Sequence, residues 1–288
     1  MQVSFIGTGI MGSRMAANLL AADQPITVYN RTAAKADELV DTGATRAANL
    51  SAAAAGADVV ITMLSEPRAV KSVATELLPR LPEGSLWMNC STVNPSFAVE
   101  MGALAQQHGI RYLDAPVAGS KAAAAGAQLV FFLGGSEADV AQVKPLTDAM
   151  GQKVVHLGDI GKGSALKIVV NQQLAVAMAS FSEGVALGES LGLPRELVVT
   201  VLLNGPLVPA FMQAKREAIM RDDYTSDVHF PLQWMQKDLE MATHTAYESG
   251  ATMPVSGAAK ESYRAAMRRG LAEADFAAIF DYYTRTAG

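Results

Sequence analysis

The sequence predicts an α/β fold in its first half, built as a doubly wound parallel sheet, followed by a long helix and an all-α second half. Up to about residue 160, short β-rich apolar runs alternate with helical patterns. After Gly163 only helical patterns follow. Regular alternation of strands and helices requires crossover connections, which place the strands parallel with helices on both faces.

The runs rich in β-branched and apolar residues predict the strands of the first half. They lie at 3–6, 26–29, 58–64, 85–90, 111–114, 128–133 and 153–157. Residues 58–64 form a continuous apolar run, as expected for a strand buried on both faces. Between them, the sequence predicts helices after Gly12 and at 33–41, 67–77, 95–108 and 137–150, and the alanine patches at 52–55 and 122–125 favour helix.

One long helix, Ser164–Leu191, is expected to open the second half. Ser164 is the predicted N-cap, Gly192 the residue after the C-cap, and Pro194 the stop. Its wide apolar face is expected to be buried and comprises Leu166, Val169, Val170, Leu174, Met178, Phe181 and Val185. Further helices follow at 195–203, 209–221, 232–249, 255–268 and 275–284. The predicted domains are therefore residues 1–163 and 164–288.

The strongest motif is a glycine loop between the first strand and the first helix. It comprises Gly7, Thr8, Gly9, Ile10, Met11 and Gly12. Gly7 permits a tight turn, Gly9 lets a pyrophosphate approach closely, and Gly12 lets the helix pack on the strand. The helix N-terminus then offers free N–H groups to phosphates. This context predicts a Rossmann-type dinucleotide-binding domain; the alternative is a glycine-rich turn in an ordinary α/β unit.

The end of the second strand favours NADP(H) over NAD(H). An NAD site usually has an acid there, which accepts from the ribose 2′-hydroxyl, but this chain has Asn30, Arg31 and Thr32. A guanidinium suits a 2′-phosphate, and Thr32 adds a hydroxyl donor. The alternative is that Arg31 is a solvated residue at the start of the next helix.

Composition excludes several classes of function. Half of the 288 residues are apolar and the net charge is −5, with no basic stripe for nucleic acid. Cys90 is the only cysteine, which favours a reducing compartment. No leader-like segment precedes the first strand, no stretch is apolar enough to span a membrane, and no metal site is predicted. We therefore expect a soluble cytoplasmic protein.

Two stretches carry candidate chemistry. Lys167 and Asn171 stand four residues apart on one face of the long helix, where partial burial would lower the lysine pKa and make it a proton donor. Alternatively, Lys167 extends to solvent and Asn171 caps a loop. Gly119 and Ser120 follow a strand end and can present backbone N–H groups to a carboxylate, or they form an ordinary turn.

Taken in order, the motifs resemble those of the β-hydroxyacid dehydrogenase family, and most closely its glyoxylate/succinic semialdehyde reductase branch. The resemblance covers the whole chain. It rests on the glycine loop and on residues 91–95, 115–121, 161–171 and 237–239. The reductase branch is favoured by the 30–32, 119–121 and 230–232 stretches, the last together with Lys237 and Asp238.

The resemblance also implies roles for individual residues. Lys167 matches the family's catalytic lysine and Asn171 its substrate-orienting asparagine. Gly119 and Ser120 match the substrate-carboxylate loop, while Phe230 and Asp238 match further substrate contacts. The residues that match cofactor contacts, beyond the glycine loop and 30–32, are Met63, Leu64, Thr92 and Lys237. Ala118 departs from the family, which usually has serine there, and this weakens the expected carboxylate clamp.

By this resemblance, the expected function is NADPH-dependent reduction of small aldehyde acids with Lys167 as general acid. The alternatives are an NAD(P)-dependent 3-hydroxyacid dehydrogenase, an imine reductase and a non-catalytic NADP-binding module. The resemblance also implies a homodimer or homotetramer.

The Arg31 assignment is testable by exchanging its charge. Arg31→Asp should shift coenzyme preference towards NADH, because a carboxylate repels a 2′-phosphate and accepts from a 2′-hydroxyl. The measurement is kcat/KM with NADPH and with NADH. An unchanged ratio would show that Arg31 does not contact the coenzyme.

Overall fold

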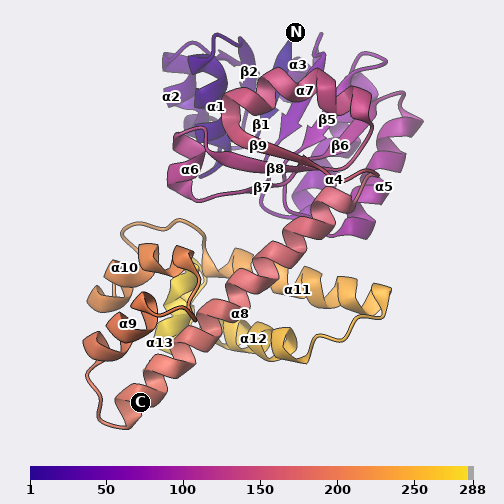
Figure 1. Ribbon diagram of the computed structural model, residues 1–288. Helices are drawn as coiled ribbons and strands as arrows, with labels where there is room; N and C mark the ends of the chain where they lie inside the picture. Colours follow the sequence, from indigo (N-terminus) through magenta and orange to yellow (C-terminus); the bar gives the residue numbers. More distant parts are fainter. Residues whose placement is uncertain (285–288) are drawn as a thin grey trace. The chain divides into compact units, whose positions relative to one another are not determined.

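A computed structural model describes residues 1–284 of the chain (Figure 1). The chain divides into two compact units, Met1–Lys167 and the part that begins at Ile168. The division falls inside the long helix α8 (Lys162–Ser190). The domain limits inferred from the sequence, 1–163 and 164–288, stay a prediction.

The first unit is built on a six-stranded, wholly parallel sheet. Its strand order is β3-β2-β1-β4-β5-β6, the doubly wound order of dinucleotide-binding domains. The strands are β1 (Val3–Ile6), β2 (Ile26–Tyr29), β3 (Thr45–Arg46), β4 (Val59–Thr62), β5 (Leu86–Asn89) and β6 (Arg111–Asp114). The predicted fold class is confirmed. Strand β3 was not predicted, because its two exposed residues carry no apolar pattern.

Alternate residues of these strands enter two separate cores, one on each face of the sheet. Phe5 and Ile61 pack with Met15 of α1 (Gly12–Ala21) and Leu146 of α7 (Glu137–Met150). The opposite core holds Ile6, Val60 and Trp87, together with α4 (Pro67–Leu77) and α5 (Pro95–Gln107). Figure 1 shows these helices around the sheet. Burial on both faces is why the strands are continuously apolar rather than alternating.

A second, three-stranded sheet follows in the order β7-β8-β9. Its strands are β7 (Val117–Ala118), β8 (Leu129–Leu133) and β9 (Gly151–His156). β7 runs antiparallel to β8, and β8 runs parallel to β9. The sequence predicted β8 and β9 but not β7, and it did not separate these strands from the main sheet.

The remaining helical segments of this unit are short. They are η1 (Ala33–Ala36), α2 (Asp37–Asp41), α3 (Leu50–Ala54), η2 (Leu78–Arg80) and α6 (Lys121–Ala125). The single helix predicted at 33–41 is therefore a 3₁₀ turn followed by a short α-helix. The helices predicted at 67–77 and 137–150 have the predicted bounds.

Helix α8 begins on a buried carboxylate. Asp114, at the end of β6, accepts from the Gly161 N–H at 2.8 Å and from the Ser164 N–H at 2.7 Å. Ser164 lies inside the helix, so its predicted role as N-cap is wrong. Burial raises the pKa of Asp114, against the effect of these N–H donors. Gly163 permits the close packing, since a Cβ there would lie 2.3 Å from the Phe132 carbonyl oxygen.

The end of α8 agrees with its prediction. Gly192 has φ +82°, its N–H donates to the Glu189 carbonyl at 3.0 Å, and the Leu193 N–H donates to the Gly188 carbonyl at 3.0 Å. These two bonds form a Schellman motif. Along the helix, Met178, Phe181 and Val185 are buried as expected, whereas Val169 is 56% exposed.

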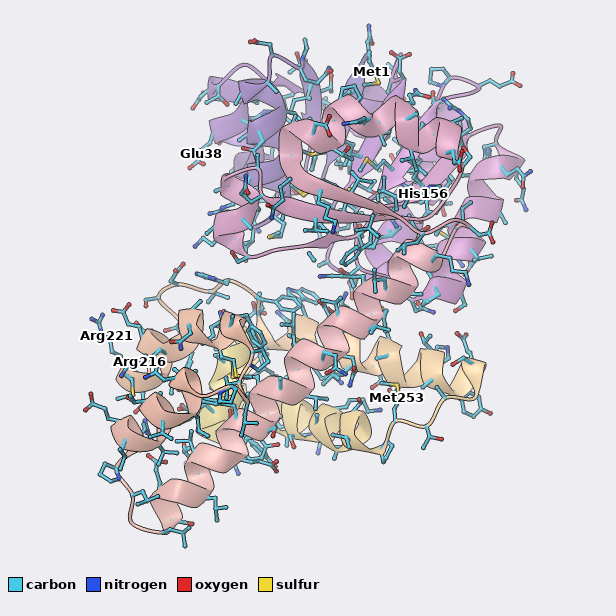
Figure 2. The ribbon with its side chains drawn as sticks, viewed as in Figure 1. Met1, Glu38, His156, Arg216, Arg221 and Met253 are labelled. Atoms are coloured by element: carbon cyan, nitrogen blue, oxygen red, sulfur yellow. The ribbon has the colours of Figure 1, made fainter. Side chains whose placement is uncertain are left out.

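The second unit is helical, and apart from the single bridge between Pro231 and Asp275 no strand pairing follows β9 in the described chain. Its elements after α8 are α9 (Arg195–Asn204), η3 (Ala210–Lys215), α10 (Arg216–Arg221), α11 (Leu232–Ser249), α12 (Pro254–Ala266), η4 (Met267–Leu271), η5 (Phe276–Ala278) and α13 (Ile279–Thr284). Arg216 of α10, labelled in Figure 2, donates to Thr200 Oγ1 of α9 at 3.0 Å.

Within residues 1–284, none of the helices has the length and apolar character needed to cross a bilayer.

The Asp114 anchor is testable by unfolding. Asp114→Asn should lower the free energy of unfolding by about 2 kcal/mol, because an amide NH₂ would face one of two buried N–H donors. Urea denaturation measures the change. Asp58→Asn is the matched control, because Asp58 accepts from the Gln2 N–H at 2.7 Å at an exposed position; it should cost under about 0.5 kcal/mol. Equal losses in the two variants would contradict the anchor.

Candidate coenzyme and substrate site

The glycine loop has the geometry that its three glycines predict. Gly7 has φ +99°, and a Cβ there would lie 2.3 Å from the Met63 carbonyl oxygen. A Cβ at Gly12 would lie 1.9 Å from the Gly7 carbonyl oxygen, so only glycine lets α1 start this close to β1. A Cβ at Gly9 would meet no atom of the described chain within 4 Å. The loop is therefore tightly packed at Gly7 and Gly12 and open at Gly9, as pyrophosphate binding requires.

Thr8 and Asn30 join the loop to the end of β2. The Thr8 N–H donates to Asn30 Oδ1 at 3.1 Å, and Asn30 Nδ2 donates to the Thr32 carbonyl at 2.9 Å. Asn30 therefore holds the loop in place through its side chain. Thr8 Oγ1 is buried, and no group of residues 1–284 bonds to it. A buried hydroxyl left without a partner beside an open glycine loop fits the phosphates of a dinucleotide.

A hollow opens beside the end of β2. Asn30, Arg31, Ala33 and Arg46 are among the residues that line it. Arg31 and Thr32 are exposed, as a 2′-phosphate contact requires. Arg46 reaches the hollow from β3. No spacing or periodicity in the sequence signals it, because the contact depends on how β3 pairs with β2.

The segments after β4 and β5 lie at the same edge of the sheet as the glycine loop. The Leu64 N–H donates to Ser91 Oγ at 2.9 Å, and both Met63 and Leu64 border Gly7. Thr92 follows the buried Ser91 and is half-buried. The predicted cofactor contacts of the first unit thus come from neighbouring strand ends. Ser91, which the sequence analysis did not name, positions Leu64.

The predicted carboxylate loop lies at the end of β7. Gly119 has φ +145°, and a Cβ there would lie 2.8 Å from Leu129 Cδ2. Ser120 Oγ accepts from the Ala123 N–H at 3.2 Å and so caps α6. The Ser120 hydroxyl keeps its own proton to donate, which suits an anionic ligand.

Lys167 and Asn171 lie one turn apart on α8, Lys167 half-buried and Asn171 2% exposed. Asn171 Nδ2 donates to Asp238 Oδ2 of α11. Since an ionised carboxylate only accepts, Asp238 fixes the amide orientation and leaves Asn171 Oδ1 as an acceptor. That oxygen is buried and bonds to no group within residues 1–284. A buried, oriented acceptor one helical turn from a lysine is suited to hold a proton donor.

Two other predicted residues of the second unit, Lys237 and Phe230, each lie next to a buried carboxylate. Lys237 Nζ lies 3.0 Å from Asp238 Oδ1. The backbone N–H of Phe230 lies 3.3 Å from Asp275 Oδ2, an atom that also accepts from Lys215 Nζ at 2.8 Å. Asp275 and Lys215 were not singled out from the sequence. They position the segment that carries Phe230.

These features define a class: a glycine loop of this geometry at the end of β1, in a sheet of this strand order, is typical of a dinucleotide-binding domain. Comparison with known proteins names the family. Residues 2–158 match the model of the NAD-binding domain of 6-phosphogluconate dehydrogenase. Residues 161–283 match the NAD-binding model of NADP-dependent 3-hydroxyisobutyrate dehydrogenase. The chain belongs to the β-hydroxyacid dehydrogenase family of NAD(P)-dependent oxidoreductases, which act on CH–OH or aldehyde groups.

Three relatives indicate the range of this similarity. Glyoxylate/succinic semialdehyde reductase 2 of Arabidopsis thaliana is 33% identical over 97% of this chain and 78% of its own. The NAD-dependent L-serine dehydrogenase of Pseudomonas aeruginosa is 34% identical over 100% and 99%. The structure of a Mycobacterium tuberculosis 3-hydroxyisobutyrate dehydrogenase with L-serine has a TM-score of 0.88, with 30% identity and 99% coverage of both chains.

Proposed function

We propose that the protein is an NADPH-dependent reductase of small aldehyde acids, of the glyoxylate or succinic semialdehyde type, with Lys167 as general acid. One observation carries the proposal. Asn171 is buried, is oriented by Asp238, and presents an acceptor one helical turn from Lys167. A protein that only binds a coenzyme has no need of such a set.

The preference for NADPH rests on the end of β2. The Asn30 side chain is hydrogen-bonded to the glycine loop. Arg31 lines the hollow, and no acidic residue of the described chain does so. A guanidinium recognises phosphate through paired charge-assisted hydrogen bonds. The name of the matching C-terminal family model includes NADP dependence, while the serine dehydrogenase relative is named as NAD-dependent.

The choice of an aldehyde acid rests on the 118–120 loop and on the reductase relative. Gly119 and Ser120 can offer backbone N–H groups and a hydroxyl to a carboxylate. Ala118 provides no hydroxyl where the family usually has one. The expected clamp therefore depends more on backbone donors.

The residues of this chain have defined tasks in that reaction. A bound reduced nicotinamide supplies the hydride. Lys167 holds the proton that the carbonyl oxygen needs as negative charge develops on it. Asn171 Oδ1 orients the ammonium group of Lys167 or a hydroxyl of the substrate, and Asp238 keeps Asn171 in that orientation.

A second candidate is an NAD(P)-dependent 3-hydroxyacid dehydrogenase. It is favoured by the serine dehydrogenase relative and by the serine-containing structure. The same residues would serve in reverse, with neutral Lys167 accepting the hydroxyl proton. The presence of Lys167 counts against an imine reductase. Imine reductases resemble this family in architecture but lack a lysine at this position.

We further propose a homodimer or homotetramer located in the cytoplasm, with domains at 1–163 and 164–288. Exposed apolar residues at the end of α8 and on α9 support self-association: Leu187, Leu191, Leu197 and Val201 are all more than half exposed.

A substrate panel tests the reaction. Consumption of NADPH should be fastest with glyoxylate or succinic semialdehyde, with kcat/KM at least about tenfold higher than with butyraldehyde, which lacks the carboxylate. Faster oxidation of L-serine or 3-hydroxyisobutyrate with NAD⁺ would favour the second candidate. No turnover across the panel would favour a non-catalytic module.

Replacing Lys167 tests its role as general acid. Lys167→Ala should lower kcat about a hundredfold or more, because acid–base groups typically contribute 10²–10⁴-fold, and the Kd for NADPH should stay near normal. Lys162→Ala is the matched control, since Lys162 is exposed on the same helix. Similar kcat values for the two variants would remove Lys167 from the mechanism.

A further inference from the structure

We propose that Arg46 is a second arginine for the 2′-phosphate of NADP(H) and so helps to determine coenzyme specificity. The inference rests on the proposed preference for NADPH and extends it to a residue on a different strand. Arg31 and Arg46 line one hollow, although η1 and α2 lie between them in the sequence.

Strand pairing places Arg46 beside the coenzyme edge of the sheet. Arg46 pairs in parallel register with Val28 of β2, and the Ala47 N–H donates to the Val28 carbonyl at 2.9 Å. Arg31 follows the end of β2. The hollow is therefore bounded by the segments that follow two neighbouring parallel strands, which is where an open α/β sheet binds ligands.

The guanidinium of Arg46 is held but not saturated by its contacts with the described chain. Its Nη2 pairs with Asp37, the first residue of α2, and its Nη1 lies 3.5 Å from the Ala33 carbonyl oxygen. A guanidinium has five N–H donors in a rigid plane, so further donors remain for an oxyanion. The side chain is 38% exposed and accessible from the hollow.

The charges at the hollow suit a phosphate monoester. Such a group carries about −1.5 to −2 charges at pH 7, which one arginine does not balance. Asp37 offsets part of the charge of Arg46, but its carboxylate is 54% exposed, and an exposed ion pair is weak enough to yield to a phosphate. Glu38, the next acid of α2, is exposed and projects away from the domain (Figure 2).

The competing explanation is that Arg46 only joins β3 to α2 through Asp37. The two roles differ in one respect. A purely structural ion pair is lost equally when either partner is neutralised. A phosphate contact is lost only when Arg46 is changed, because removal of Asp37 leaves the guanidinium in place and frees another donor.

The experiment measures binding of two nucleotides by isothermal titration calorimetry. The probes are 2′,5′-ADP, which carries the 2′-phosphate, and 5′-AMP, which lacks it. The proteins are the full chain, Arg46→Gln, Arg31→Gln and Asp37→Asn, each with its Tm recorded. Arg46→Gln should raise the Kd for 2′,5′-ADP about tenfold or more and change the Kd for 5′-AMP by less than about twofold. Asp37→Asn should bind 2′,5′-ADP as tightly as the wild type or more tightly.

Three results would overturn the inference, and they separate its failure from that of the proposed coenzyme. If the wild type prefers 2′,5′-ADP, and Arg31→Gln but not Arg46→Gln abolishes this preference, only the role of Arg46 fails. If Arg46→Gln and Asp37→Asn weaken both nucleotides equally, Arg46 is structural. If the wild type binds the two nucleotides alike, the preference for NADPH itself fails.

Discussion

The close approach of α1 to the end of β1 is the contact on which the first unit depends. At Gly12 the helix backbone lies against the Gly7 carbonyl, and at Gly7 the turn lies against Met63, which follows β4. No side chain fits at either position. This packing fixes the N-terminus of α1 at the carboxyl edge of the sheet, beside β1 and β4, where the strand order reverses. It also leaves Gly9 open. The proposed coenzyme site is therefore a consequence of backbone contact, and the side chains of Asn30 and Thr8 refine it.

Buried carboxylates perform a comparable positioning task in both units. Asp114 receives two backbone N–H groups at the start of α8 and fixes the first turn of the helix that carries Lys167. Asp238 orients the amide of Asn171, and Asp275 gathers Lys215 with the backbone beside Phe230. Each acid is almost fully buried and is bonded to more than one donor or cation. An isolated buried charge would be unfavourable, so these acids are stable only in the complete arrangement.

Membership of the β-hydroxyacid dehydrogenase family sets the reaction class but leaves its details to a few positions. The relatives include reductases of aldehyde acids and a dehydrogenase of serine. In the proposed mechanism, Lys167, Asn171 and Asp238 would serve either direction, because a lysine gives or accepts a proton at the same oxygen. Coenzyme preference is instead expected to depend on the hollow at the end of β2, and substrate choice on residues 118–120.

The sequence alone determined the fold class, the glycine loop, most strand positions and the end of α8 at Gly192. These features depend on local chemistry: apolar runs, periodicity, and glycine where φ is positive. Only the tertiary structure showed that Ser164 is not the cap of α8, because Asp114, fifty residues earlier, takes that role. It also joined Asn171 to Asp238 and Arg46 to the hollow of Arg31. Such pairings depend on strand order and helix packing, and no local pattern in the sequence encodes which distant residues will meet.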